Sequence, residues 1–134
     1  MINMNIARIK ETCIYVSDLE KTNEFYGGKL KLPVISIVAG RHIFFQAGSS
    51  VLLCFIAAET KRSKELPPHG ADGIIHFAFE VVKEEYALAL ESIHDAGINI
   101  LHEHVWKGGV KSFYFEDPDR NLVEVIQQGF WEQY

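Results

Sequence analysis

The segment Lys111-Ser-Phe-Tyr-Phe-Glu-Asp-Pro-Asp-Arg-Asn-Leu-Val-Glu124 contains two strand-like runs on either side of a short polar turn. Aromatic residues dominate the first run and branched apolar residues the second, which predicts strands near 112–116 and 122–126. An earlier part of the chain has the same arrangement, with strand-like residues 42–46 and 51–56 around the turn Gly48-Ser49-Ser50. The chain is therefore expected to contain this hairpin twice.

Outward from the hairpins, each copy is preceded by a strand, a helix and a further strand. In the first copy these elements are predicted at 12–16, from Ser17 or Asp18 to Gly27-Gly28, and at 34–38. In the second copy they are predicted at 74–81, 83–96 with Gly97 as the stop, and near 98–101.

The two copies superpose as sequences. A shift of 65 positions places Ile14 on Phe79 and Val16 on Val81. The last strands align at a larger shift of 71 positions, which places Leu53 on Glu124. A repeat of about 60 residues is too long for a solenoid unit and indicates a duplicated half-domain. We predict an α+β fold of two βαβββ modules, whose curved sheets form a cup with the helices on the outer face. The modules cover about 8–57 and 72–129, a linker covers about 58–71, and the 134 residues form one domain.

Composition narrows the function classes. The chain is 48% hydrophobic and 23% charged with a net charge of −5, as expected of a globular protein without a basic surface for nucleic acid. Its longest apolar run, Val51 to Ala58, is too short to cross a membrane, and the first residues do not resemble a secretory signal. We therefore expect a cytoplasmic protein with no nucleic-acid or membrane partner, whose Cys13 and Cys54 are reduced.

Strand alternation assigns one sheet face to the helices and the other to the cup. The helix-facing set is Thr12, Ile14, Val16, Phe77, Phe79 and Val81. Glu11 and His76 then occupy equivalent positions on the cup face, as do Leu53 and Glu124. If Glu11, His76 and Glu124 converge, one imidazole and two carboxylates can hold a single Mn²⁺, Fe²⁺, Co²⁺, Ni²⁺ or Zn²⁺ with positions left open for substrate.

Other interpretations of these residues remain open at this point. His76 can be a core or surface histidine, and Glu11 can be a solvated strand start beside Lys10. A carboxylate between Val123 and Val125 is costly to bury unless it is paired or metal-bound, which favours Glu124 as a ligand. A register slip of one residue would replace Leu53 by Cys54 on the cup face.

Five further residues are candidates for substrate binding, although sheet packing or a solvated edge explains them equally well. They are Tyr114, Ser112, His42, His104 and Trp106. The chain has no G-x-S-x-G, no glycine-rich phosphate loop and no H-E-x-x-H, so acyl transfer, nucleotide binding and zincin proteolysis are not supported.

Several of these motifs together resemble the vicinal oxygen chelate superfamily, which includes glyoxalase I, fosfomycin-resistance thiol transferases, bleomycin-resistance proteins and extradiol dioxygenases. The resemblance covers roughly residues 8–129. It rests on Glu11, Asp18-Leu-Glu-Lys, Phe25-Tyr26, His76-Phe-Ala-Phe-Glu-Val and the segment 111–124. It implies that His76 and Glu124 are metal ligands, that Glu11 replaces the usual His or Gln, and that Leu53 replaces a fourth ligand. Arg120 replaces the usual glycine of the turn, which predicts a turn without positive φ there.

The resemblance implies a glyoxalase-like lyase or isomerase, or a thiol transferase, that stabilises an oxyanion or enolate on a divalent metal. Glu124 is then the candidate catalytic base. The alternative is a metal-free protein of the bleomycin-resistance kind, which binds an antibiotic or another small molecule. Members of the superfamily are generally homodimers, often with a cup completed across the interface. We therefore expect a homodimer, in which Glu11 and His76 of one site come either from the same chain or from different chains.

Overall fold

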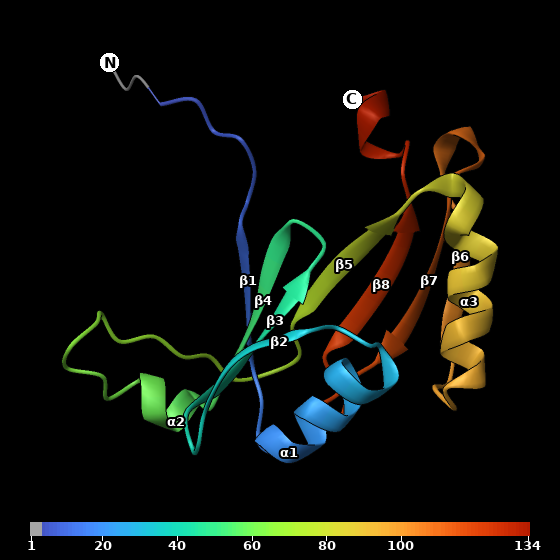
Figure 1. The fold of residues 1–134 in the computed structure, drawn as a ribbon. Coiled ribbons are helices and arrows are strands. Elements are labelled where there is room, and N and C mark those ends of the chain that lie inside the picture. The colour runs from blue at the N-terminus through green and yellow to red at the C-terminus, as the bar shows by residue number, and fades with distance from the viewer. Residues whose placement is uncertain (1–3) are drawn as a thin grey trace. The chain divides into compact units, whose positions relative to one another are not determined.

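The computed structural model describes residues 4–134, which form two compact units divided between Asp72 and Gly73. Each unit contains one four-stranded sheet with helices (Figure 1). The predicted α+β class and the two repeated modules are confirmed. Across residues 4–134, every helix is too short or too polar to span a membrane.

The first unit follows the predicted order of elements. Its strands are β1 (Glu11–Tyr15), β2 (Val34–Val38), β3 (His42–Ala47) and β4 (Ser50–Phe55), in the sheet order β1-β4-β3-β2. Its helices are α1 (Leu19–Thr22), the π-helical segment η1 (Asn23–Lys29) and α2 (Ala57–Thr60). Asp18 caps α1 by accepting a hydrogen bond from the Lys21 backbone N–H, which satisfies one of the donors exposed at a helix start.

The second unit repeats this arrangement. Its strands are β5 (His76–Val81), β6 (His102–Val105), β7 (Lys111–Glu116) and β8 (Leu122–Gln127), in the order β5-β8-β7-β6. Its helix α3 (Tyr86–Asp95) is preceded by the short turn η2 (Lys83–Glu85) (Figure 1). Two further 3₁₀ turns are η3 (Lys107–Gly109) and η4 (Trp131–Gln133). In both units the first strand is parallel to the last, and the other pairs are antiparallel.

Each sheet buries the face that its helices cover. In the first unit this face carries Ile14, Ile43, Phe45, Leu52 and Cys54, all at most 1% exposed. Phe113, Phe115 and Val123 are fully buried on the corresponding face of the second unit, where Tyr86 of α3 packs on Phe113. Because Cys54 lies in this core, the slip that would place it on the opposite face is excluded. We call that opposite side the open face of each sheet.

One prediction for the connecting segments was wrong. The strand expected near 98–101 begins only at His102, because Gly97 turns the chain with a φ of 77° and the following Ile98 is buried next to α3. The segment predicted as a linker, about 58–71, includes most of the single helical turn α2. Four residues are too few to give a periodic pattern.

The turn between β7 and β8 also differs from the prediction, because Arg120 has a φ of 66°. The Asp117 carboxylate accepts hydrogen bonds from the backbone N–H groups of Asp119 and Asn121, at 2.9 and 2.8 Å, and these bonds hold the tight turn. Asn121 donates to Asp117 through Nδ2 and accepts through Oδ1 from the Ile75 backbone N–H at 3.1 Å. The turn therefore fixes the start of β5, where His76 lies, beside the start of β8.

Candidate functional site

His76 and Glu124 lie next to each other on the open face of the second unit. His76 Nε2 is 3.2 Å from Glu124 Oε1. The Glu124 side chain is only 8% exposed, whereas that of His76 is 49% exposed. The other carboxylate oxygen, Oε2, is buried and has no hydrogen-bond partner among the residues that the structure describes. A buried acceptor without a partner costs about 1–3 kcal/mol, so this oxygen is a site where a ligand would be stabilising.

The tautomer of His76 follows from its second contact. Nδ1 lies 3.0 Å from the carbonyl oxygen of Leu122, which can only accept, so Nδ1 carries the hydrogen. In the neutral ring Nε2 then presents a lone pair to Glu124 Oε1, which presents another. Such a contact is repulsive unless a cation, either a proton or a metal ion, lies between the two atoms.

These two residues fit a divalent metal ion. Two donors held about 2.1 Å from one ion at right angles lie about 3.0 Å apart, close to the separation of Nε2 and Oε1. Metal-bound histidines usually donate their second ring N–H to a carbonyl or carboxylate, as His76 does. The second unit thus carries two donor groups in a spacing and tautomer suited to a metal.

The strand registers support the equivalence on which the Glu11 prediction depends. Glu11 pairs with Val51 in the first unit, and His76 pairs with Leu122 in the second. Leu53 and Glu124 each lie two residues further along. Glu11 belongs to the first unit, and within neither unit do the described residues gather three His, Cys, Asp or Glu side chains in a metal-binding group. Its role as the third ligand stays a prediction.

Four of the predicted substrate-binding residues also lie in the second unit. Tyr114 is the register partner of Glu124 on the neighbouring strand. Burial raises the pKa of its hydroxyl, and so does the Glu124 carboxylate, whereas a hydrogen bond with Ser112 acts in the opposite direction. Tyr114 is therefore a protonated hydrogen-bond donor at neutral pH, beside the carboxylate.

The side chains of Ser112 and Trp106 are hydrogen-bonded to each other. The Trp106 indole N–H donates to the hydroxyl of the buried Ser112 at 2.9 Å, and the His104 ring packs against the indole at 4.3 Å. Sequence reasoning left His102 out of the substrate-binding set, although its ring stands 6.0 Å from that of Tyr114 on the same face. Its position two residues before His104 was the available signal.

The fifth predicted residue, His42, belongs to the first unit and is buried in a polar and aromatic environment. Its ring stacks on Phe44 at 3.9 Å, and its two nitrogens contact Arg41 Nη1 and, at 3.2 Å, Ser36 Oγ. Burial lowers the pKa of His42, and the Arg41 charge lowers it further. Arg41 can only donate, so His42 accepts through Nδ1 and donates from Nε2 to Ser36.

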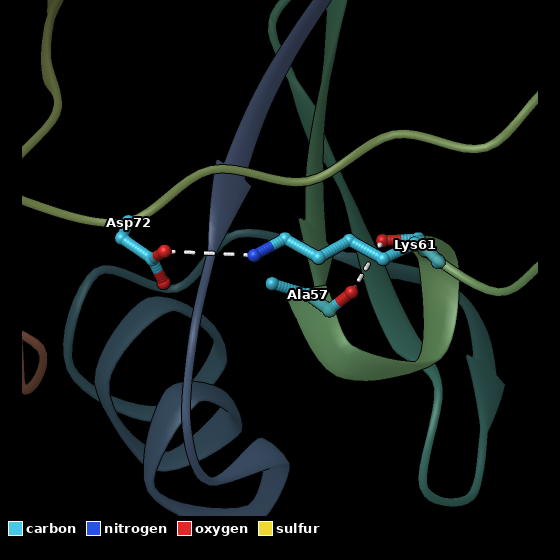
Figure 2. A network of polar contacts seen from close by, with 4 residues as sticks. Ala57, Lys61 and Asp72 are labelled. Atoms are coloured by element: carbon cyan, nitrogen blue, oxygen red, sulfur yellow. Dashed lines mark hydrogen bonds and ion pairs between the residues drawn. The ribbon is translucent and has the colours of Figure 1, made fainter.

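The sequence analysis missed His69, which covers part of the open face in the first unit. Its Nδ1 is hydrogen-bonded to the Tyr15 hydroxyl at 2.8 Å, and its ring packs edge-on against Phe55 at 4.7 Å. The segment 61–72 that carries it is closed at its ends by Lys61 and Asp72, which form an ion pair at 3.5 Å (Figure 2). A histidine between Pro67-Pro68 and Gly70 gave no periodic pattern that would place it on a sheet.

Comparison with known proteins identifies the family. The model of the Glyoxalase/Bleomycin resistance protein/Dioxygenase superfamily matches residues 8–125. The chain belongs to this superfamily. Its fold is similar to that of lactoylglutathione lyase from Agrobacterium tumefaciens, with a TM-score of 0.90 and 32% identity over 96% of this chain and 98% of the other. The resemblance inferred from the motifs is thereby confirmed.

Two curated relatives are more distant. Glutathione transferase FosA of Serratia marcescens is 28% identical over 115 residues, which cover 82% of this chain and 73% of the relative. Virulence protein STM3117 of Salmonella typhimurium is 25% identical over 130 residues, which cover 94% and 88%. The chain is thus similar to proteins named for two different reactions.

Proposed function

We propose that the chain is a metal-dependent enzyme of the glyoxalase type, either a lyase or isomerase or a thiol transferase. The observation that carries this proposal is the contact between His76 Nε2 and Glu124 Oε1, together with the buried Oε2, which has no hydrogen-bond partner within residues 4–134. His76 and Glu124 would hold a divalent ion of Mn, Fe, Co, Ni or Zn, which would provide the carboxylate with the partner it lacks among the described residues. Glu11 is the proposed third ligand.

Each residue of the second unit then has a definite task. His76 keeps its ligand nitrogen in place because Leu122 holds the other ring nitrogen. Tyr114 would donate a hydrogen bond to a substrate oxygen. Glu124 would either remain a ligand or leave the metal and accept a proton from the substrate carbon or thiol. The metal supplies Lewis acidity, which stabilises negative charge on the substrate oxygens.

The names of two relatives support a thiol-derived substrate. Both the transferase from Serratia and the lyase from Agrobacterium are named for glutathione chemistry. A thiol adduct that presents two adjacent oxygens is therefore the proposed substrate class.

We also propose that the protein is a homodimer. Light scattering at micromolar concentration tests this proposal, and a measured mass equal to that of a single chain would contradict it.

A metal-free binding protein is the second candidate. It is favoured by Leu53, which has no donor atom at the position equivalent to Glu124. Such a protein would hold a small molecule on the same open faces without reacting with it. Metal binding separates the two candidates.

The test is metal analysis of untagged protein purified without chelators, followed by calorimetric titration of each of the five ions. We expect one ion per chain, lost in His76→Ala. His94→Ala is the matched control, because His94 lies on the exposed side of α3 with an 81% exposed side chain. If none of the five ions binds to the wild-type protein, the enzyme proposal is wrong and the binding protein replaces it.

A further inference from the structure

The first unit contains a cleft of about 450 Å³ that the proposed metal site does not use. Val38, Arg41 and His42 at the β2–β3 hairpin form one side. Arg62, Lys64 and Leu66, in the segment after α2, form the other. This volume lies within the range of small-molecule binding sites, about 300–1,000 Å³.

The charge of the cleft differs from that of the whole chain. Its lining contains three basic and two acidic residues, whereas the chain has 13 basic and 18 acidic residues. Arg62 is neutralised by Glu59, whose carboxylate is 2.6 Å away. In the described part of the chain, neither Arg41 nor Lys64 has a carboxylate within the 4.0 Å of an ion pair. Two cations are thus available to an incoming anion, with Glu65 as the opposing charge.

Arg41 is held in place before any ligand arrives. Its guanidinium lies 5.4 Å from the centre of the Phe55 ring, and Nη1 donates to His42 Nδ1. His42 is in turn fixed by its stack on Phe44 and its bond to Ser36. Only one of the five guanidinium N–H donors is used by His42, so a planar fork of donors remains for a ligand.

We propose that this cleft binds a small organic anion, a carboxylate carried on an apolar body, with Arg41 as its anchor. The planar fork of a guanidinium matches the two oxygens of a carboxylate. Lys64 adds a second positive charge. Val38 and Leu66, which are 44% and 63% exposed, provide apolar surface for the body of the ligand. His42 is a positioning residue, because it orients Arg41. The proposal does not depend on the metal.

The probe is benzoate, titrated into chelator-treated full-length protein and followed by NMR chemical shifts. We expect saturable binding that weakens at least tenfold in Arg41→Gln and is only partly restored in Arg41→Lys, which keeps the charge without the planar fork. Arg8→Gln removes an equal charge from an exposed residue outside the cleft and is expected to leave the affinity unchanged.

Two further ligands separate the components of the recognition. Benzyl alcohol keeps the ring without the charge, and inorganic phosphate keeps the charge without the apolar body; both are expected to bind more weakly than benzoate. The proposal is wrong if benzoate does not saturate, or if Arg41→Gln and Arg8→Gln bind it equally. Phosphate binding as tight as benzoate would also overturn it, because the site would then be a general anion site. His42→Phe should weaken benzoate binding less than Arg41→Gln does.

Discussion

Replacing Glu124 by glutamine should make the metal-free protein more stable while it weakens metal binding. In the metal-free protein, a buried carboxylate faces the lone pair of His76 Nε2, and its second oxygen has no partner in the described residues. Glutamine removes the buried charge and supplies an N–H group that can donate to Nε2. The side chain that favours metal binding therefore destabilises the empty protein.

The magnitude follows from these contacts. The glutamine N–H turns the contact between two acceptors into a hydrogen bond, which contributes about 0.5–1.5 kcal/mol, and the buried charge is removed, so Glu124→Gln should raise the free energy of unfolding by about 1–2 kcal/mol without metal. For a chain of 134 residues this corresponds to a rise in Tm of roughly 4–8 °C. Metal at about 100 times its Kd should stabilise the wild-type protein by about 2.7 kcal/mol, and the variant by much less. The order of stability should thus reverse when metal is added.

The assay is thermal unfolding at pH 8.5, with a chelator or with each divalent ion. Glu116→Gln is the control, because this residue lies on the same sheet but makes only an exposed contact of 3.8 Å with Arg120. It should change stability by less than about 1 kcal/mol and keep the full metal effect. A chelated Glu124→Gln protein that unfolds below the wild type would refute the reasoning, because His76 and Glu124 would then form a stabilising ion pair.

Three further predictions concern single positions. Leu53→Glu should lower stability without metal and increase the stabilisation by added metal. Cys54→Glu should only destabilise the protein, because Cys54 is fully buried in the core. Calorimetry with Mn²⁺ distinguishes the two variants. Arg120→Gly should be about 1 kcal/mol more stable than Arg120→Ala in urea unfolding, because only glycine adopts the observed φ of 66° without strain. Burial raises the pKa of Tyr86 to about 12, with a further contribution from Glu103. Since its folded pKa exceeds the ordinary value of 10.0, Tyr86 contributes stability that is lost as pH rises from 10.0 to about 12, and Tyr86→Phe should reduce this alkaline loss in a pH series of melting curves.

The repeated hairpins could be predicted because their strands alternate strongly between buried and open faces. The superposition of Leu53 on Glu124 requires the first and last strands to pair in the same register in both units. The observed pairs, Glu11 with Val51 and His76 with Leu122, meet this requirement. The contact between His76 and Glu124 follows from this register. The same alternation placed Cys54 in the core.

The missed features have no comparable pattern. β6 is an edge strand whose four residues are all exposed, so neither face carries an apolar stripe and its start was placed too early. His69 reaches the first sheet from an irregular segment, through contacts with Tyr15 and Phe55 that no local spacing encodes. The positive φ of Arg120 arises from hydrogen bonds to Asp117 that together outweigh the strain of a non-glycine residue.

The turn between β7 and β8 also positions His76, a candidate metal ligand. Asn121 holds the Ile75 backbone N–H, and Leu122 donates its own N–H to the Ile75 carbonyl at 2.8 Å. These bonds fix the residue before His76 against the start of β8. The Leu122 carbonyl then accepts from His76 Nδ1, so the same short stretch of main chain sets the position of β5 and the tautomer of its histidine. Glu124 is only two residues beyond Leu122 on β8. The positions of both donor groups are therefore set by the same short segment of this strand. A turn motif that contains no ligand itself can therefore serve the proposed metal site, because it holds the two candidate donors at a fixed spacing.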